Sequence, residues 1–387
     1  MVQNLPVPLD RRVWLECRTL VTAGFSVAVV CPRGEGDPRY EELEGVHLHK
    51  YTPPPVATGL FGYLREFVVC WLKTAFLALR VRRRHGFDVI QTCNPPDTYW
   101  ALALPFKLLG VRFVFDQHDL CPEVYVSRFP ESRRALVWGL RLLERATYRV
   151  ADHVISTNES YRQVAVTRGR ISPDRVSVVR SGPDPNRLFR GEAVPELRRG
   201  RTHLCCYLGV MGPQDRVDLV VRAADHIVHG LGRDDVHFAL LGFGDCLDEL
   251  RRLATDLGLG DRVTFTGRVD QDAIRAYLST ADVGLAPDPK SPLNDVSTHN
   301  KVMEYMACEV PVVSFDLKET RVSAGEAALY VERDGDAEAF ADAVVALLDD
   351  PDRRARMGEL GRRRVEEELA WAHQAPAYVE VFERLVS

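Results

Sequence analysis

The sequence predicts an α/β protein made of two doubly wound domains. Its 387 residues, 46% of them hydrophobic, suffice for two complete cores at about 150 residues per domain. Short β-branched runs alternate with longer amphipathic segments from end to end, which is the pattern of βαβ units with parallel sheets. Near the middle, the turn-forming run Ser181–Asn186 suits a linker between the domains.

Six short runs in each half predict the strands of the two sheets. In the first half they are Ser26–Cys31, Val46–Lys50, Asp88–Thr92, Arg112–Asp116, His153–Thr157 and Arg175–Arg180. In the second half they are His203–Leu208, His237–Leu241, Val263–Thr266, Val283–Ala286, Val310–Phe315 and Ala328–Val331.

We expect three segments: a first domain over residues 1–182, a second over 183–367, and a helix over 368–387 that crosses back to the first domain. Charge differs between the halves: residues 1–180 carry 25 basic and 18 acidic side chains, and residues 181–387 carry 25 and 37. This asymmetry suggests two domains with different partners, although unequal halves also arise by drift.

The beginning of the chain departs from the plan of a doubly wound domain, which normally opens with a full central strand. Met1–Gln3 offer only the last residues of one before Asp10 caps a helix over Arg11–Ala23. Each buried backbone group left unpaired beside a missing strand costs about 1–3 kcal/mol. We therefore expect a truncated first strand, caused by a start site placed too late or by loss of preceding residues.

Cysteine use and hydropathy indicate a cytoplasmic protein. The nine cysteines are scattered and show no metal-ligand spacing, which is typical of reduced thiols. No apolar run approaches the ~20 residues of a membrane-spanning helix, and we expect no signal peptide.

Two basic amphipathic helices are predicted, over residues 64–84 and 132–150. In the first, one face carries apolar side chains from Leu64 to Leu79, and arginines such as Arg80 and Arg84 flank it. The plain interpretation is a pair of core-facing helices with solvated arginines. The alternative is peripheral contact with anionic lipid at the inner face of the plasma membrane.

Ligands of open α/β sheets bind beyond the carboxyl ends of the strands, and that rule selects seven loops. In the first domain they are Asn4–Leu9, Asn94–Asp97 and Gln117–Asp119; in the second they are Gly209–Asp215, Gly242–Asp245, Gly267–Val269 and Pro287–Asn300.

These loops hold the first candidate site residues. His118 follows an apolar strand by two residues, where we weigh substrate contact against a structural hydrogen bond. The glycines around Gly209 and Gly242 would let backbone approach a phosphate, but glycines also simply end strands. Walker, G-x-S-x-G, H-E-x-x-H and complete G-x-G-x-x-G motifs are missing from the sequence, which disfavours nucleotidases, hydrolases, metalloproteases and dehydrogenases.

The segment Asn300–Ala307 is the most informative stretch. A polar loop opens a helix here, and the helix leads into the buried strand that contains Pro311–Val313. The N-terminus of a helix presents unpaired N–H groups and suits a diphosphate. Glu304, one turn inside, is placed to accept hydrogen bonds from ribose hydroxyls; the alternative is an ordinary exposed carboxylate.

Lys301–Ala307 followed by Pro311–Val313 resembles the donor-site helix of glycosyltransferase family 4, whose members have the GT-B fold of two Rossmann-like domains facing a cleft. The resemblance extends over nearly the whole chain, and it includes Asn4–Trp14, Phe115–Asp119, Ser181–Phe189, Phe265–Val269 and Phe315–Leu317.

The resemblance implies transfer of a sugar from a nucleotide diphosphate with retention and without a metal or other cofactor, a UDP-sugar being the favoured co-substrate. Glu304 resembles the second glutamate of the family's E-x7-E pair, which holds the ribose. His118 resembles the first-domain histidine near the transferred sugar, and the Arg268–Val269 backbone resembles the base-binding loop. His118 and Glu304 are thus the expected catalytic residues.

The full set of expected contacts combines this resemblance with the loop positions. On the donor side they are Gly209, Met211, Gly212, Arg216, Gly242, Gly244, Arg268, Val269, Asn294, Asp295, Ser297, Asn300, Lys301 and Glu304; on the acceptor side they are Asn4, Asn94, His118 and Asp119.

Several positions depart from the family pattern. Val296 stands where the first glutamate of the pair belongs, so Asn294, Asp295 or Ser297 would serve the sugar hydroxyls. The phosphate-binding arginine and lysine would fall near Val210 and Asp215, leaving Arg216 and Lys301 as the basic substitutes. Glu309 replaces a usual glycine and is expected near the phosphates, and the glycine-rich loop of the first domain is replaced by Leu5–Pro8.

Two functions follow. The first is a retaining glycosyltransferase acting on a hydroxyl acceptor, either a lipid-linked saccharide of cell-wall or exopolysaccharide synthesis or a secondary metabolite. The alternative is a non-catalytic protein or partner subunit that binds sugar nucleotides, which the departures favour. No nucleic acid is expected as a partner.

Overall fold

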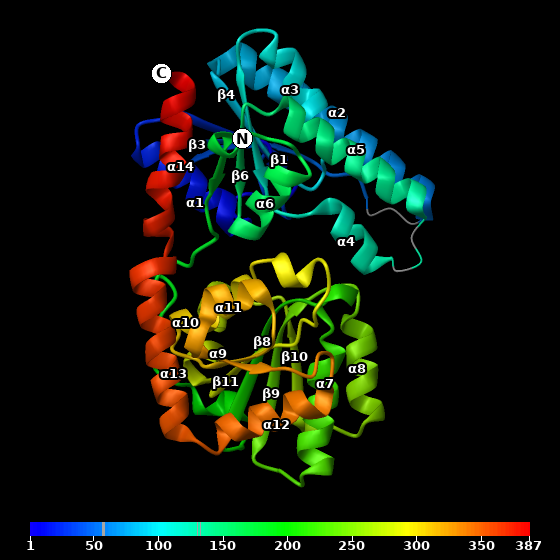
Figure 1. The fold of residues 1–387 in the computed structure, drawn as a ribbon, viewed down its shortest axis with the longest axis vertical. Coiled ribbons are helices and arrows are strands. Elements are labelled where there is room, and N and C mark those ends of the chain that lie inside the picture. Colours follow the sequence, from blue (N-terminus) through cyan, green and yellow to red (C-terminus); the bar gives the residue numbers. More distant parts are fainter. Residues whose placement is uncertain (56–58, 130, 132) are drawn as a thin grey trace. The chain divides into compact units, whose positions relative to one another are not determined.

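The computed structural model describes residues 1–55, 59–129, 131 and 133–387, and they form two compact units (Figure 1). The first unit comprises Met1–Pro122, Ser132–Arg180 and Gln374–Ser387; the second comprises Glu123–Glu131 and Ser181–His373. The chain thus passes from the first unit to the second at the start of the turn-rich run that we expected to be a linker, and its last residues belong to the first unit.

The first unit contains two sheets. One has the order β1-β3-β2, with β1 at Val27–Pro32, β2 at Tyr40–Leu43 and β3 at Val46–Tyr51. The other has the order β4-β5-β6-β7 and is parallel throughout, with β4 at Val89–Cys93, β5 at Arg112–Gln117, β6 at His153–Ser156 and β7 at Val176–Val178.

Strand β2 is the one strand of this unit that the sequence analysis did not predict. It pairs antiparallel with β3 through a tight turn at Glu44 and Gly45, whose φ values are 50° and 81°. Such paired positive φ values are those of a type I′ hairpin turn. The strand lies at the edge of the sheet with mostly exposed, acidic side chains, so it lacks the apolar alternation by which strands are recognised.

Met1–Gln3 lie between the two sheets of the first unit. Val2 forms parallel bridges to Val30 of β1 and Thr92 of β4, and its N–H donates to the Gln91 carbonyl at 2.9 Å. These residues stand where a central strand belongs. A cavity of about 360 Å³ beside them is lined by residues at the starts of both neighbouring strands, including Ser26–Ala28 and Asp88–Ile90.

Helices cover both faces of the first unit. Asp10 caps the first of them, as predicted, by accepting from the Val13 N–H at 3.1 Å. In the last, Tyr378 donates to Gln91 Oε1 at 2.7 Å, and Phe382 packs on Phe25 with ring centroids 6.2 Å apart. The helices of this unit are α1 (Arg11–Thr22), α2 (Gly59–His85), α3 (Trp100–Lys107), α5 (Arg134–Val150), α6 (Glu159–Thr167) and most of α14 (Trp371–Val386), while most of α4 (Cys121–Arg128) belongs to the second unit.

Helices α2 and α5 correspond to the two predicted basic amphipathic helices. The second was expected to begin at Ser132, which lies outside the described residues. Within the residues that the structure describes, no helix is both long and apolar enough to cross a membrane.

The second unit is built on one six-stranded parallel sheet with the order β10-β9-β8-β11-β12-β13, which confirms the predicted doubly wound α/β class. Its strands are β8 (His203–Val210), β9 (Val236–Phe243), β10 (Val263–Gly267), β11 (Val283–Ala286), β12 (Val312–Phe315) and β13 (Ala328–Val331).

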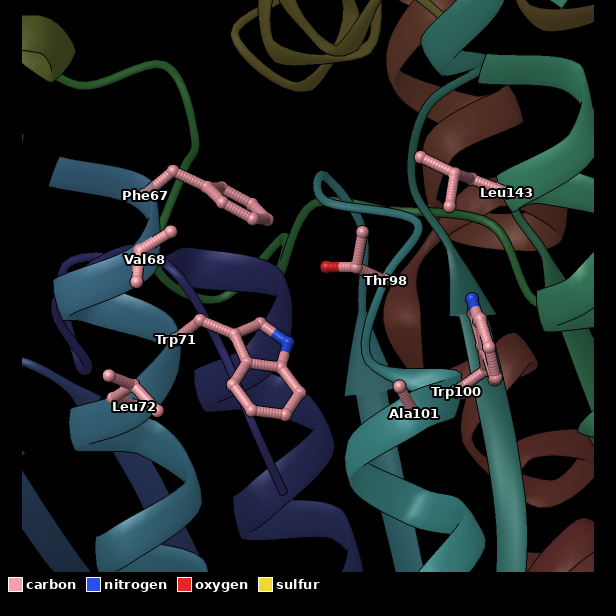
Figure 2. A pocket seen from close by; sticks show the side chains of 8 residues that line it. All are labelled: Phe67, Val68, Trp71, Leu72, Thr98, Trp100, Ala101 and Leu143. Carbon is pink, nitrogen blue, oxygen red and sulfur yellow. The ribbon is translucent and has the colours of Figure 1, made fainter. Parts of the chain in front are cut away.

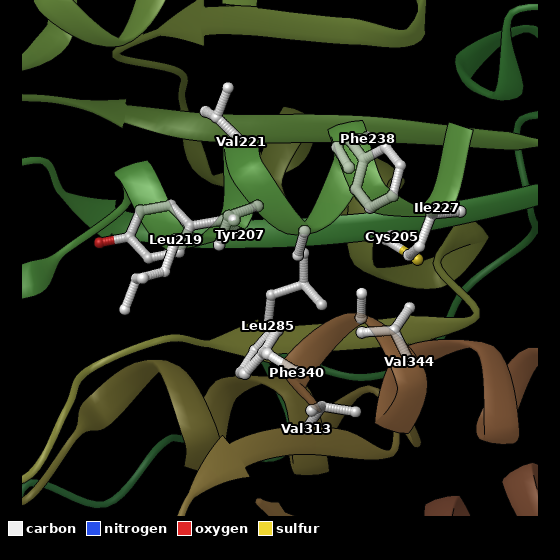
Figure 3. Packing of buried hydrophobic residues seen from close by; sticks show 14 of the residues in the cluster. Cys205, Tyr207, Leu219, Val221, Ile227, Phe238, Leu285, Val313, Phe340 and Val344 are labelled. Carbon is white, nitrogen blue, oxygen red and sulfur yellow. The ribbon is translucent and has the colours of Figure 1, made fainter. Parts of the chain in front are cut away.

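Buried side chains hold helices on both faces of this sheet. On one face, Phe238 and Leu285 pack against α7 and α12 through residues such as Phe340 (Figure 3). On the other face, Tyr305 of α10 packs against strand residues such as Leu208. The helices of the unit are α7 (Asp218–Asp225), α8 (Leu247–Asp256), α9 (Gln271–Thr280), α10 (Asn300–Ala307), α11 (Lys318–Ala324), α12 (Ala337–Leu348) and α13 (Pro351–Arg364).

The expectation that Glu309 lies near the donor phosphates is wrong. Helix α10 runs from Asn300 to Ala307, and Glu309 follows its C-terminal end, a full helix length from the N-terminus that was expected to face a diphosphate. Its φ of 57° is left-handed, the conformation in which glycine ends helices at least cost. The usual glycine at this position is therefore explained by backbone geometry.

Replacing Glu309 by glycine should relieve this strain. We expect Glu309→Gly to stabilise the protein by about 0.5–1 kcal/mol, since a left-handed residue with a Cβ is strained while glycine adds entropy to the unfolded chain. The free energy of unfolding in urea measures the gain. Glu309→Ala keeps the Cβ and removes the charge, so an equal gain in that variant would attribute the effect to charge instead.

Candidate active site

Asn94 organises the loops that follow β4 and β5 in the first unit. Its Oδ1 accepts from the backbone N–H groups of His118 at 2.7 Å and Asp119 at 3.1 Å. Its Nδ2 donates to the Asp119 carbonyl at 2.7 Å, and Asn4 donates to the carbonyl of Pro95 in the same loop. The four residues expected on the acceptor side therefore lie together.

A buried carboxylate, Asp116, lies under this cluster at the end of β5. Arg12 of α1 donates to its Oδ1 at 3.0 Å, and Gln91 of β4 donates to its Oδ2 at 3.1 Å. The Nε2 atom of His118 is 2.7 Å from the same Oδ2. Arg12 also donates to the Val179 carbonyl at 2.9 Å, so one guanidinium joins α1, β5 and the end of the first unit's chain segment.

The charges of this cluster follow from burial and from Arg12. Burial alone would raise the pKa of Asp116, but the charges of Arg12 and His118 hold it well below its usual range. Burial and the Asp116 charge raise the pKa of Glu16 well above its ordinary value, although Arg12 Nε lies 3.0 Å from Glu16 Oε1. Arg12 thus contacts both buried carboxyl groups.

The ring of His118 is oriented by this carboxylate. His118 Nε2 lies 2.7 Å from Asp116 Oδ2 and 3.2 Å from Arg12 Nε. These two contacts hold one nitrogen of the ring and leave Nδ1, the other ring nitrogen, for a ligand hydroxyl.

Cys93, Asp116 and His118 also have donor atoms within 4.8 Å of one another, close enough to share a metal ion. The Arg12 guanidinium, 3.0 Å from Asp116, already supplies a positive charge there. The geometry accordingly fits an ion-paired acid–histidine cluster.

In the second unit, the strand order reverses between β8 and β11, which are neighbours in the sheet. In doubly wound sheets, this switch point is where loops at the carboxyl ends diverge and leave a crevice for ligands. The loops that begin at Gly209 and at Pro287 follow these two strands. Most of the expected donor-binding residues lie on them.

The glycines of these loops allow the ends of neighbouring strands to pack closely. Gly209 and Gly242 are register partners in β8 and β9, and a Cβ on Gly242, whose φ is 151°, would overlap the Gly209 carbonyl oxygen. Met211 donates its N–H to the Phe243 carbonyl at 2.8 Å, and Gly212 donates its N–H to Asp215 Oδ2 at 2.9 Å. The amide groups of Met211 and Gly212 are thus already used within the unit.

The basic candidates near the crevice are paired with carboxylates. Lys301 lies 2.9 and 2.8 Å from the two oxygens of Asp288, and both side chains are buried. His299 Nε2 lies 3.7 Å from the same carboxylate. Arg216 donates to Asp218 at 2.8 and 3.1 Å. A diphosphate that used these cations would have to replace the carboxylates.

The residues that precede α10 hold the loop in shape. Asn294 Nδ2 donates to the carbonyls of Gln214 at 3.2 Å and Pro289 at 2.9 Å, which ties this loop to the one after β8. Asp295 accepts from the Lys318 N–H at 2.9 Å, and the Ser297 hydroxyl donates to the Leu293 carbonyl at 2.8 Å. Of the three proposed substitutes for the missing glutamate, each therefore already has a structural partner.

Helix α10 begins at Asn300, which is exposed, and Glu304 lies one turn further and is half-buried. At the end of β10, the guanidinium of Arg268 stacks on the Phe243 ring, 3.8 Å from its centroid, and Val269 follows. The Arg268–Val269 backbone and the Phe243 ring thus lie together at the position expected to bind the nucleotide base.

The expected site residues did not include Arg12, Asp116 or Asp288. Asp288 follows the predicted strand Val283–Ala286 by two residues, and that position was the available signal. Arg12 is the second of two consecutive arginines on a predicted amphipathic helix. Arginines at such positions are ordinarily expected to be exposed to solvent.

The pKa of Asp215 allows the crevice to be tested through the pH dependence of stability. Burial and the nearby Asp288 raise the pKa of Asp215 to about 6, even though Lys301 lowers this pKa. An acid whose folded pKa is raised destabilises the fold once it ionises, and stability falls as pH rises through that range. We expect Asp215→Asn to stabilise by about 2–3 kcal/mol at pH 8 and by roughly half as much at pH 5.

Urea unfolding at the two pH values measures this difference. The exposed Asp256→Asn on α8 serves as the control, with an expected change within about 0.5 kcal/mol at both pH values. A gain from Asp215→Asn that is the same at pH 5 and pH 8 would contradict the assignment.

Comparisons with known proteins agree with this architecture. The model described as "Glycosyltransferase Family 4" matches residues 9–187, and that described as "Glycosyl transferases group 1" matches residues 202–350. The GDP-mannose-dependent alpha-(1-6)-phosphatidylinositol monomannoside mannosyltransferase of Mycobacterium tuberculosis is 34% identical over 77% of this chain and 70% of its own length.

Two further proteins are similar over most of the chain. The alpha-D-kanosaminyltransferase of Streptomyces kanamyceticus is 26% identical over 85% of this chain and 86% of its own. Among solved structures, a sucrose-phosphate synthase from Thermosynechococcus elongatus superposes with a TM-score of 0.79 at 20% identity, covering 99% of this chain and 96% of that one. The chain therefore belongs to glycosyltransferase family 4, whose members are glycosyl-transferring enzymes of the GT-B fold.

Proposed function

We propose that this enzyme transfers a sugar, with retention, from a nucleotide-diphosphate sugar bound by the second unit to a hydroxyl of an acceptor bound by the first. The observation that carries the proposal is the position of α10. It opens with Asn300 after the loop from the switch-point strand β11 and carries Glu304 one turn inside. A helix N-terminus favours phosphate, and a carboxylate one turn away suits ribose hydroxyls.

The proposed reaction needs no enzyme nucleophile. The acceptor oxygen forms the new bond to the anomeric carbon on the face from which the diphosphate leaves, and a leaving phosphate oxygen takes the acceptor proton. The N–H groups at the start of α10 stabilise the developing negative charge. Lys301 and Arg216 assist when they exchange Asp288 and Asp218 for phosphate oxygens, so we assign no step to a metal ion.

His118 is the proposed acceptor-side group of the reaction. Asp116 fixes its ring at 2.7 Å, which directs Nδ1 toward a hydroxyl or developing charge. We expect His118→Ala to lower kcat by about 10²–10³-fold, the usual effect of losing one oriented polar group in an active site. Calorimetry should find that His118→Ala binds the donor with a Kd within twofold of that of the wild type. A large loss of donor binding would contradict the acceptor-side role of His118.

The donor is proposed to be a UDP-sugar, with GDP-mannose as the next choice because the M. tuberculosis relative is named for it. The acceptor is either a lipid-linked saccharide of cell-wall or exopolysaccharide synthesis or a secondary metabolite. The name of the M. tuberculosis relative, a phosphatidylinositol monomannoside mannosyltransferase, supports the first class. Peripheral contact with the inner face of the plasma membrane through α2 and α5 would accompany the lipid-linked acceptor.

Calorimetric titration with UDP-, GDP- and dTDP-sugars tests the donor site. We expect Glu304→Ala to weaken binding of the preferred donor. We also expect it to lower kcat/KM by a factor that corresponds to about 1.5–3 kcal/mol of transition-state stabilisation, the value of a hydrogen bond to a charged group. The exposed Glu326→Ala is the matched control and should leave both unchanged. Unaltered donor affinity in Glu304→Ala would reject the site, and tight binding without turnover would favour a non-catalytic sugar-nucleotide-binding protein.

A further inference from the structure

Gln91 of β4 lies at the centre of a chain of buried hydrogen bonds in the first unit. Its side-chain Nε2 donates to Asp116 Oδ2 at 3.1 Å and to Glu16 Oε2 at 2.8 Å. Its Oε1 accepts from the Tyr378 hydroxyl of α14 at 2.7 Å. Gln91 and Tyr378 are both buried, so the protein itself supplies the partners of this amide.

The Tyr378 hydroxyl determines which way the amide of Gln91 points. Burial raises the pKa of Tyr378 well above its ordinary value, so the hydroxyl keeps its proton and can donate it. An amide whose oxygen accepts from this hydroxyl turns its NH₂ group toward the two carboxyl groups. The reverse orientation would direct the amide oxygen at ionised Asp116, so that one acceptor would face another.

The same oxygen of Asp116 contacts the ring of His118. Oδ2 lies 3.1 Å from Gln91 Nε2 and 2.7 Å from His118 Nε2. A carboxylate that shares one oxygen between an amide and an imidazole is held in orientation by both, so the loss of either contact allows it to turn. The side chain of His118 is 16% exposed, so these contacts lead from the core to a group that a ligand can touch.

A second contact of α14 leads to the same carboxylate. Gln374, one helical turn before the tyrosine, accepts from the Arg180 N–H at 3.1 Å through its Oε1. The carbonyl of the preceding residue, Val179, accepts from Arg12 at 2.9 Å. Arg12 in turn donates to Asp116 Oδ1 at 3.0 Å. Two side chains of α14 are therefore connected to the two oxygens of one carboxylate.

The aromatic ring of Tyr378 is held independently of its hydroxyl. The ring packs on Phe382 with centroids 5.1 Å apart, and Phe382 packs on Phe25. Because carbon atoms make these contacts, Tyr378→Phe removes the hydroxyl and keeps the ring packing. The hydroxyl thus adds a directed bond to Gln91 to a helix that its apolar side chains already hold.

We propose that Tyr378 is a positioning residue for glycosyl transfer, acting through Gln91 and Asp116 on the ring of His118. The proposal rests on the function proposed above, in which His118 is the acceptor-side group. Tyr378 is fully buried, so it acts without touching a ligand. Trp371–His373 of α14 belong to the second unit, so the helix that returns the chain to the first unit also orients this histidine.

Nitrogen NMR of the histidine rings tests the positioning directly. In protein labelled with ¹⁵N-histidine, the ring signals that His118→Ala removes are those of His118. We expect Tyr378→Phe to shift both ring-nitrogen signals of His118, because Gln91 loses the partner that orients its amide and Asp116 turns. Unchanged His118 signals in Tyr378→Phe would overturn the proposal.

Two control variants accompany this measurement. Tyr330→Phe removes a hydroxyl of the second unit that donates to the Gly325 carbonyl at 2.9 Å, which is the same chemical change elsewhere. Leu72→Ala alters the wall of an apolar pocket of about 260 Å³ in the first unit, none of whose eight lining residues belongs to the chain of hydrogen bonds (Figure 2). Both should leave the His118 signals as in the wild type. Shifts as large as that of Tyr378→Phe would assign the effect to general loosening of the fold and overturn the proposal.

Release of UDP from UDP-glucose, with water as the acceptor, is the second measurement, and GDP-mannose is the alternative donor. We expect Tyr378→Phe to lower kcat about threefold to tenfold, the value of one hydrogen bond, with the donor KM within about twofold of wild type. Tyr330→Phe should change neither. In the His118→Ala background, Tyr378→Phe should have no further effect, because residues that act through one another are not additive. Equal losses in both backgrounds would reject the proposal.

The two measurements separate this proposal from the function on which it rests. If the wild type binds and turns over no nucleotide sugar while the His118 signals respond to Tyr378→Phe, the transferase function is rejected and the coupling of Tyr378 to His118 is confirmed. If the wild type turns over its donor and Tyr378→Phe changes neither kcat nor the His118 signals, the positioning proposal alone is rejected.

Discussion

The first unit depends on the burial of one ionised carboxylate, Asp116. An isolated charge in such a site is strongly disfavoured, and here Arg12 offsets it at 3.0 Å while Gln91 and His118 complete its hydrogen bonds. Gln91 also accepts from Tyr378 of the last helix at 2.7 Å. The polar contacts of α1, β4, β5 and α14 thus converge on one group, and the orientation of His118 is a result of the same arrangement.

The second unit solves a different electrostatic problem. Its crevice contains Asp215 and Asp288 beside Lys301, so the resting site carries more acid than base within reach. An ion pair that is buried stabilises little on balance, but it keeps the ammonium group of Lys301 in position, with only 9% of its side chain exposed. A phosphate arriving there meets a lysine that is already desolvated, and the exchange of one anion for another costs less than bringing a hydrated lysine in.

Much of the fold was predictable because its signals are local. Parallel strands such as Val283–Ala286 are buried on both faces and therefore appear in the sequence as apolar runs. Asp10 is a residue type that caps helices, and it caps this one by accepting a hydrogen bond from Val13 three residues further along the chain. The exposed edge strand Tyr40–Leu43 lacks such a signal, and the pairing of Arg12 with Asp116 joins residues 104 positions apart, which no local pattern reveals. Glu309 was misplaced because a motif's spacing does not tell which end of a helix faces the ligand.

The first unit is assembled from both ends of the chain, since Gln374–Ser387 belong to it, whereas nearly all of the second is contiguous. During synthesis, the first 180 residues must therefore wait for the last ones. At about 5–20 residues per second, the 207 residues after Arg180 take roughly 10–40 s to make. Through that interval Gln91 has no Tyr378 hydroxyl to bond, while the second unit is free to fold. The unit that contains the N-terminus is accordingly the last to gain all of its residues.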